Sequence, residues 1–562
     1  MNRAFKLERR RWALWCGAWC ALMPAFLMAQ ATEQANPVAH SFDGAYTIAG
    51  TVVNATTGEP VQRALVSVLS ETDGREVASV ESDAVGHFAI ERLAADKYPL
   101  IAAKRGYARS FYDEHEGFNT AIVTGPDQDT THLTFRLTPH ATLHGVVTAD
   151  GGDPVESARV ILFEKRQLPG SDEPIHERET AITDDTGAYE FGDLGPGDYL
   201  VAVLAQPWYA LHNRNRAGAS GTENNAQLDV AYPATYFDST TDEAAATPIA
   251  LAGGNREQVN LKLHAVPAIR LAVEAPRKAD GRLARPQLTQ MIFGVPEGSE
   301  SVGFLDALKT GSTEFEGVAP GHYEMTAGNP QRVLELNAAQ SSTVDLNNGI
   351  GTVTVTGTVR RTGEAKGPAE AQLFLRPHGT TPSHANLTAT VQNGHFQLEG
   401  VAPGNWTVTA EAGGPFPSIN RIVPVLAITT DSATHTGNAL TVQDQPLNVT
   451  VILGEGGTAR IDGFARKNIK GFAGVLVLLV PKDPATLQVL ARRDQSDSDG
   501  SFSLRNVLPG RYTIVAIEDA WDLDWTRPEV VARYLAKGTP VTVTNTQDAR
   551  LQLAAPVTVQ SR

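Results

Sequence analysis

The sequence predicts an all-β protein, a series of tandem β-sandwiches with short helical insertions. Three observations lead to this prediction. A motif of two turns and two alternating apolar runs occurs five times, a second apolar pattern precedes four of the copies, and a closing apolar run follows most of them. The composition agrees, because 50 Gly and 33 Pro in 562 residues, with 42% apolar residues, are typical of a globular chain with many turns.

Each copy of the motif has a turn glycine, a second turn residue ten positions later, and an aromatic residue two positions after that. These positions are Gly86, Asp96 and Tyr98; Gly187, Gly197 and Tyr199; Gly311, Gly321 and Tyr323; Gly394, Gly404 and Trp406; and Gly500, Gly510 and Tyr512. Strict alternation after the first turn indicates a strand with one buried face. A Pro-Gly pair makes the second turn in four copies, with Pro fixing φ and Gly supplying a positive φ. Each copy therefore predicts two antiparallel strands joined by a tight turn, with the aromatic residue buried at a sandwich corner.

A front half precedes four copies and reads G-x-V, a polar turn, and further alternating apolar residues, as at Gly50, Val52 and Val66. Copy three lacks this half and is expected to be the least regular. Closing strands bring each unit to about seven strands, the size of an immunoglobulin-like sandwich. We expect five such domains, with short connectors that make a semi-rigid string. The expected boundaries are 40–138, 139–266 with an insertion at 206–249, 267–350, 351–454 and 455–556.

The N-terminal segment 1–31 predicts a signal peptide. Five basic residues precede the uncharged stretch 12–29, and residues 29–31 read Ala-Gln-Ala, a small-x-small cleavage pattern. An uncleaved membrane anchor is the alternative, because about 18 apolar residues just reach across a bilayer. We expect an exported chain, in the periplasm, on the cell surface or in the medium, with no membrane contact after cleavage.

Both cysteines, Cys16 and Cys20, lie inside this segment, so the mature chain would have neither disulfides nor thiol chemistry. Removing residues 1–31 would change the net charge from −16 to about −20. Such an acidic surface argues against nucleic acid and anionic lipid as partners. The best helical insertion is 526–538, where Thr526 and Glu529 form a capping box and Gly538 can end the helix.

The front half and the D-x-x-G-x-[FY]-x-[FIL]…P-G-x-Y repeat resemble carboxypeptidase regulatory-like domains. The resemblance implies transthyretin-like sandwiches, related to Cna-B-type adhesin modules and to starch-binding-like folds. It covers copies one and two well, copies four and five fairly, and copy three poorly. In the peptidases this domain is the non-catalytic companion, and the wider fold includes carbohydrate binders. The resemblance therefore implies a fold rather than a reaction.

Catalytic motifs are missing from the sequence. Residues 176–179 fit H-x-x-E formally, but they lie in an expected polar loop with no peptidase domain around it. There is no H-E-x-x-H, G-x-S-x-G or P-loop motif. An adhesin-type isopeptide bond would need a lysine in a first strand, and the expected first strands 46–53, 141–147, 269–273, 352–360 and 458–466 contain none. We predict no enzyme and no cofactor.

Two kinds of binding site remain as candidates. Asp494, Asp497 and Asp499 precede Gly500 and either bind Ca²⁺ or simply form a turn, although their spacing is not that of an EF-hand loop. Two aromatic clusters either bind carbohydrate by stacking or cover the ends of their own sandwiches. The first cluster is Trp208, Tyr209, Tyr232 and Tyr236, with Phe237, and the second is Trp521, Asp522, Asp524 and Trp525.

These observations favour a non-enzymatic exported interaction or spacer protein of the cell envelope. The alternative is a carbohydrate-binding protein that uses one of the aromatic clusters. The partner would then be a polysaccharide or another envelope protein.

Overall fold

The computed structural model describes residues 44–562 except for short internal segments. These segments are 167–174, 211–226, 279–280, 302–312, 363–370, 379–380, 382–385, 413–420, 432, 455–458 and 545–549. The predicted signal peptide, its two cysteines and the turn glycine of copy three lie outside the described residues. Within the described part of the chain, no helix combines the length and the apolar character that crossing a bilayer requires.

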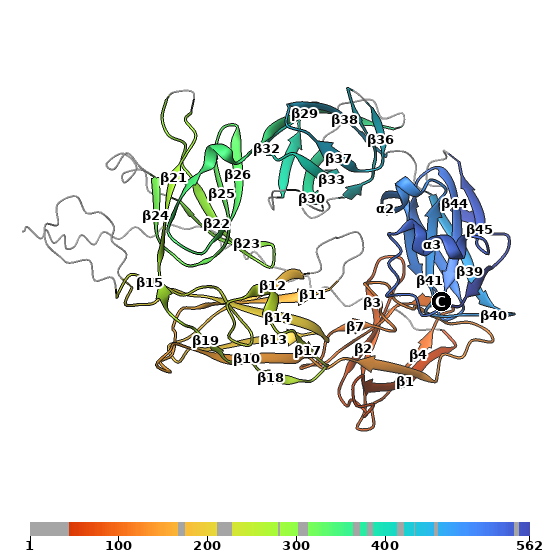
Figure 1. Ribbon diagram of the computed structural model, residues 1–562. Helices are drawn as coiled ribbons and strands as arrows, with labels where there is room; N and C mark the ends of the chain where they lie inside the picture. The colour runs from red at the N-terminus through yellow and green to blue at the C-terminus, as the bar shows by residue number, and fades with distance from the viewer. Residues whose placement is uncertain are drawn as a thin grey trace, which may run out of the picture. The chain divides into compact units, whose positions relative to one another are not determined.

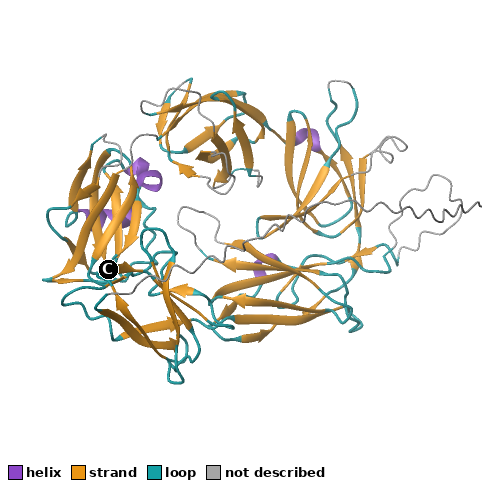
Figure 2. Ribbon diagram, turned by 180° about the vertical axis from the view of Figure 1, so that it is seen from behind, coloured by secondary structure: helices purple, strands orange, loops and turns teal. Residues whose placement is uncertain are grey.

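The described chain is almost entirely β-structure, arranged as five β-sandwiches that we number modules 1–5 (Figures 1 and 2). The all-β fold predicted from the sequence is therefore confirmed. Each module encloses its own cluster of buried apolar side chains.

Modules 1 and 2 each pair a three- or four-stranded sheet with a larger one. Module 1 has sheets β4-β1-β9 and β3-β2-β6-β7, and module 2 has sheets β13-β10-β18 and β12-β11-β14-β16. The elements of module 1 are β1 (Tyr46–Asn54), β2 (Leu65–Leu69), β3 (Glu76–Glu81), β4 (His87–Leu93), β5 (Lys97–Tyr98), β6 (Leu100–Ala103), β7 (Ser110–Phe111), β8 (Ile122–Val123) and β9 (Leu133–Leu137). Those of module 2 are β10 (Ala141–Thr148), β11 (Arg159–Lys165), β12 (Ile175–Ile182), β13 (Ala188–Leu194), β14 (Gly197–Leu204), β15 (Val230–Ala231), β16 (Thr235–Tyr236), η1 (Glu243–Ala245), β17 (Ile249–Leu251), β18 (Arg256–Gln258), β19 (Leu261–Lys262) and β20 (Val266–Pro267).

Modules 3 and 4 also consist of two sheets each, and in module 4 both sheets have five strands. Their sheets are β24-β21-β27 with β23-β22-β25-β26-β28, and β32-β29-β38-β35-β36 with β31-β30-β33-β34. The elements of module 3 are β21 (Ile269–Glu274), β22 (Gln287–Ile292), β23 (Val295–Ser301), β24 (Thr313–Val318), β25 (Gly321–Gly328), β26 (Gln331–Ala338), β27 (Ser342–Asp345), η2 (Leu346–Asn348) and β28 (Ile350–Gly351). Those of module 4 are β29 (Val353–Arg361), β30 (Ala371–His378), β31 (Leu387–Val391), β32 (His395–Val401), β33 (Gly404–Ala412), β34 (Arg421–Val423), β35 (Val425–Thr430), β36 (Thr434–Thr436), β37 (Ala439–Val442) and β38 (Leu447–Leu453).

In module 5 the two layers join, because β47 pairs with both β39 and β44. Its elements are β39 (Ala459–Lys467), β40 (Lys470–Gly471), β41 (Leu476–Pro481), η3 (Pro484–Thr486), α2 (Leu487–Leu490), β42 (Arg492–Gln495), β43 (Ser501–Val507), β44 (Gly510–Ile517), α3 (Pro528–Leu535), β45 (Thr539–Val543), β46 (Arg550–Gln552) and β47 (Val557–Gln560). The predicted helix is thus shorter than 526–538. Its N-cap is Arg527 rather than Thr526, whose hydroxyl instead donates to Asp524.

The two strands of each repeat do not form the predicted hairpin. In module 2, β13 pairs with β10 in one sheet and β14 pairs with β11 in the other. The corresponding pairs β4 and β6, β24 and β25, and β32 and β33 are divided in the same way. In module 5, whose layers are joined, β43 pairs with β39 whereas β44 pairs with β41. Alternation gave the strands correctly but could not say which sheet each one joins. The second turn is therefore a corner that carries the chain from one layer to the other.

A hydrogen bond explains why the corner aromatic has the same spacing in all five copies. In all five modules the ring donates to the backbone carbonyl oxygen four residues earlier, at distances of 2.8–3.3 Å. The donors are Tyr98, Tyr199, Tyr323, Trp406 and Tyr512, and their acceptors are Ala94, Gly195, Ala319, Ala402 and Leu508. All five rings are buried. The predicted buried corner aromatic is thus confirmed.

The glycines of the repeat serve different purposes from the ones predicted. The four first-turn glycines that the structure describes do have positive φ, for example 74° at Gly187. Among the second-turn glycines, however, only Gly404 does; the positive φ instead falls four residues earlier, as at Asp193. The reason is a bulge just before the corner, where the pairing register shifts. Position 510 favours glycine for another reason, because a Cβ there would lie 3.0 Å from the ring of Tyr512.

The front-half glycine makes room for a neighbouring strand. Gly145 lies opposite Tyr189, and a Cβ on it would come within 1.8 Å of the carbonyl oxygen of Val259. Module 3 has Val273 at the equivalent position, paired with Thr313. Copy three thus has a front half in structure, β21 and β22, although its sequence pattern was missed.

Candidate functional site

The first aromatic cluster is divided between surface and core. Trp208 and Tyr209 follow β14 and form an edge-to-face pair with ring centroids 5.7 Å apart, and Trp208 is 92% exposed. Tyr232 and Tyr236 are buried. Burial, with the hydroxyl of Tyr209 nearby, raises the pKa of Tyr232 to about 12. Of the four predicted residues, Trp208 and Tyr209 are the pair with a ring open to solvent.

Tyr236 belongs to a contact between modules 2 and 3. Its hydroxyl donates to Glu243 (3.0 Å), which also accepts from the backbone N–H of Phe293 (2.9 Å). Burial raises the pKa of Tyr236, and the charge of Glu243 adds to this. The ring of Phe293 packs edge-on against Phe163, with centroids 5.2 Å apart. The outer face of the β11–β14 sheet thus shares a buried apolar cluster with the β22–β23 turn.

An ion pair accompanies this apolar contact. Arg159 Nη2 donates to Glu297 Oε2 at 2.6 Å, and the Glu297 side chain is 3% exposed. Burial raises the pKa of Glu297, although the hydrogen bond from Arg159 opposes the shift. Because a buried carboxylate left alone is costly, this pair favours one fixed geometry of the two modules.

The second aromatic cluster, Trp521 to Trp525, contacts module 1. Trp521 stacks on His115 with ring planes 9° apart, and it also lies against Phe118. Its Nε1 donates to the carbonyl oxygen of Gly474. Trp525 lies under the guanidinium of Arg493, 4.8 Å from the ring centroid.

The two acids of this cluster have partners inside module 5. Asp522 pairs with Arg562 at 2.7 Å, and Asp524 accepts from Thr526 and pairs with Arg527. The predicted residues are therefore close together, but Trp521 is covered by module 1 and does not form an open stacking platform.

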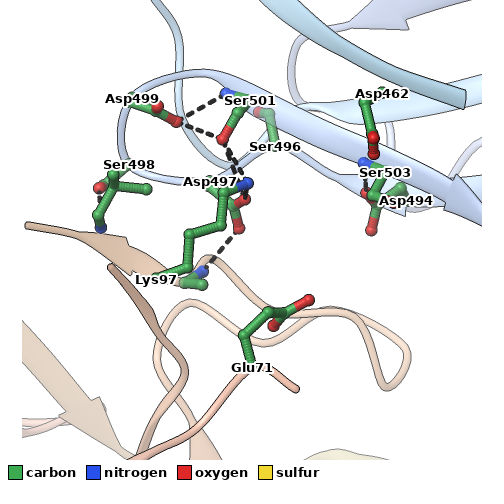
Figure 3. Close-up of polar contacts among 12 residues, drawn as sticks. Glu71, Lys97, Asp462, Asp494, Ser496, Asp497, Ser498, Asp499, Ser501 and Ser503 are labelled. Carbon is green, nitrogen blue, oxygen red and sulfur yellow. Dashed lines mark hydrogen bonds and ion pairs between the residues drawn. The ribbon is translucent and has the colours of Figure 1, made fainter. Parts of the chain in front are cut away.

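The acidic turn of module 5 also faces module 1 (Figure 3). Lys97 Nζ donates to Asp497 Oδ2 (2.5 Å) and to Ser501 Oγ (2.7 Å). Asp499 accepts from the backbone N–H of Ser501 (2.8 Å), as expected of turn chemistry. Asp494 points elsewhere and accepts from the backbone N–H of Ser503. Among the described residues, no group of three or more His, Cys, Asp or Glu side chains is placed to hold a metal ion.

Burial sets the charge state of this turn. It raises the pKa of Asp494 to about 7, and the nearby charge of Asp497 acts in the same direction. It raises the pKa of Asp497 as well, against the opposing effect of Lys97. Asp462 behaves differently, because hydrogen bonds from Arg460 and Arg550 outweigh its burial and lower its pKa.

The structure corrects two details of the sequence predictions, which concern the H-x-x-E motif and the lysine of an isopeptide bond. His176 to Glu179 lie on the exposed edge strand β12 and not in a loop. The first strand of module 5 extends to Lys467, one residue beyond the expected range, so it does contain a lysine. Lys467 Nζ pairs with Glu518 at 2.6 Å, and its side chain is 43% exposed.

Four side chains that surround these candidates were not predicted from the sequence. Lys97, His115, Arg493 and Gln495 all contact the opposite module, roughly 400 residues away along the chain, and no local pattern signals such a contact. The one available signal was the density of Asp and Ser at 494–503, which was assigned to calcium or to a turn.

Comparison with known families agrees with this architecture. Residues 47–138 match the carboxypeptidase regulatory-like domain, and residues 350–414 with 461–537 match the second β-sandwich domain of BOS complex subunit NOMO1-like proteins. The chain therefore contains a carboxypeptidase regulatory-like domain, module 1, within a tandem array of β-sandwiches. No curated protein sequence matches the chain.

Several solved structures are similar to parts of the chain. The TIE protein of Bacillus anthracis is 9% identical, over 73% of this chain and 75% of its own, with a TM-score of 0.17. The minor pilin GBS52 of Streptococcus agalactiae is 13% identical, over 40% and 97%, with a TM-score of 0.19. The major pilin subunit BcpA of Bacillus cereus is 11% identical, over 74% and 98%, with a TM-score of 0.13.

Proposed function

We propose that the chain is an exported, non-enzymatic spacer or interaction protein of the cell envelope. The observation that carries this proposal is the apolar cluster shared by modules 2 and 3. The outer face of a sandwich sheet normally contacts water, yet Ile161 and Phe163 on that face are fully buried, together with Ile292 of module 3. Apolar burial used in this way stabilises the spacing between modules as well as the modules themselves.

Further contacts at the junctions support a semi-rigid string. β15 of module 2 pairs with β20 at the junction to module 3, and Arg270 pairs with Asp229 across the same junction at 3.2 Å. Thr56 of module 1 donates to the carbonyl oxygen of Gly253 in module 2. The matched families are a regulatory-like domain and a β-sandwich domain, which supports a role without catalysis. Export rests on the predicted signal peptide.

Cell fractionation followed by crosslinking tests this proposal. We expect the chain, shortened by about 31 residues, in the envelope or outside the cell, crosslinked to a defined partner. A chain that stays in the cytoplasm at full length would refute export. Limited proteolysis of the same preparation tests the predicted domains. We expect resistant fragments ending near 138, 266, 350 and 454, and cleavage inside the sandwiches would count against those boundaries.

Carbohydrate binding by Trp208 and Tyr209 is the second candidate function. The exposed indole of Trp208 favours it, because a flat aromatic face in water can stack on a sugar ring. The second cluster enters this candidate only in a chain whose modules 1 and 5 are apart, since Trp521 is otherwise covered. A glycan array with the wild-type chain, Trp208→Ala and Ile469→Ala decides the matter. Ile469 is a matched control that is 88% exposed in module 5. Binding lost only in Trp208→Ala supports this function, and no binding by the wild type refutes it.

A further inference from the structure

One loop of module 1 makes most of the contact with module 5. It runs from 112 to 123, begins directly after β7 and includes β8, and we call it the docking loop. Its backbone forms hydrogen bonds with module 5. The N–H of Ala121 donates to Asp497 Oδ1 (3.1 Å), the N–H of Ser498 donates to the carbonyl oxygen of Ala121 (3.0 Å), and the N–H of Val123 donates to Ser498 Oγ (2.8 Å).

A glutamine of module 5 forms hydrogen bonds with polar groups of the docking loop. Gln495 Nε2 donates to Thr120 Oγ1 at 2.8 Å and also to the backbone oxygen of Asp113. His115 Nδ1 lies 3.2 Å from Gln495 Oε1. Gln495 is 1% exposed. A buried amide that lost these partners would be left unsatisfied, so the contact specifies one alignment of loop and module.

Charged and aromatic groups flank this polar centre. Arg493 pairs with Glu116 (2.5 Å) and lies over the ring of Phe118, whose other neighbour is Trp521. On the opposite side, the Lys97 and Asp497 side chains are 29% and 14% exposed, so their ion pair is largely shielded from water (Figure 3). Both modules thus supply matched groups over the whole contact.

We propose that the docking loop and the 493–501 segment of module 5 form a specific latch that holds the first and fifth modules of one chain together. Most of its contacts are polar, as in interfaces that can separate, whereas obligate interfaces are mainly apolar. Each module also has its own apolar core, so the latch can open without unfolding either one. The latch is independent of the proposed spacer function, because it concerns two surfaces of this chain whatever the chain binds.

Hydrogen exchange of the full chain tests the latch. The perturbation is Lys97→Met, which lies outside both measured segments and leaves Asp497 without its cation. We expect exchange in 112–123 and 495–501 to accelerate together by about tenfold or more, because a shielded carboxylate without its partner is strongly unfavourable. The matched control is Lys467→Met, which removes an ion pair with Glu518 inside module 5 and should leave both segments unchanged.

Each other outcome has a defined meaning. Acceleration in one segment alone, or in neither, overturns the proposal. If Lys97→Met also exposes β44, module 5 itself has unfolded, and Phe118→Ser on the module 1 side decides by the same paired readout. Light scattering is measured alongside. A dimeric mass with protection that is lost on dilution would show that the contact joins two copies, which also overturns the latch within one chain.

Discussion

Asp494 makes module 5 sensitive to pH near neutrality. Its pKa rises from the ordinary value of 3.8 to about 7, because its carboxylate is buried and lies near the charge of Asp497. A pKa raised on folding means that the folded state holds the proton more tightly. The associated stability is fully present below about pH 4 and is lost as the pH rises through about 7. The full effect is about 4 kcal/mol, with about 2–3 kcal/mol of it falling between pH 5 and pH 8.

The substitution Asp494→Asn isolates this effect. Asparagine keeps an oxygen to accept the backbone N–H of Ser503 but carries no charge at any pH. Native-state hydrogen exchange of β44 amides, corrected for intrinsic rates, measures the opening free energy of module 5 from pH 5 to pH 8. We expect it to fall with pH in the wild type and to fall much less in the variant, where the raised pKa of Asp497 is the remaining contribution.

The other charges near Asp494 define the control. Asp497 with Lys97, and Asp462 with Arg460 and Arg550 beyond Ser503, are unchanged in the variant. A slope that persists undiminished in Asp494→Asn would place the titration in one of these groups, and a level wild-type profile would refute a raised pKa altogether.

Three further predictions concern packing. Trp406→Ala should destabilise module 4 by about 3–5 kcal/mol in denaturant titration followed by exchange, because the ring is 1% exposed; a cost below about 1 kcal/mol would contradict the corner assignment. Gly145→Ala should abolish protection in β10, since its Cβ would meet the carbonyl oxygen of Val259, and unchanged protection would show that the strands can separate there. Arg159→Met should cost about 1–3 kcal/mol by leaving Glu297 buried without its cation, seen as faster exchange in β22 and β23 only; no change would mean that the pair does not fix the junction.

Much of the fold follows from local patterns in the sequence. The turn glycine at Gly187 and the corner ring at Tyr199 were both predictable. A positive φ favours glycine and the buried corner holds an aromatic residue, so both features are visible as residue types in the sequence. The division of β13 and β14 between two sheets was not predictable in this way. Period-2 alternation reports that a strand has a buried face, and both layers of a sandwich bury one.

The candidate sites were harder to predict for a related reason. Trp521 was predicted as a candidate binding residue, but its stacking on His115 depends on a contact across roughly 400 residues of chain. Copy three shows the opposite failure. Its first strand carries Val273 where the other copies carry glycine, so the residue-type signal is absent although the strand is present.

The parallel pairing of first and last strands has a mechanical consequence. In module 4, β29 runs parallel to β38, with register partners from Val355 opposite Leu447 to Arg361 opposite Leu453. The chain enters the module at one end of this ladder and leaves it at the other end. Tension along the chain therefore shears every hydrogen bond of the ladder at once and does not peel them apart one by one. A parallel pairing of the first strand with a closing strand recurs in all five modules, so we expect the same shear geometry in each when the chain is pulled.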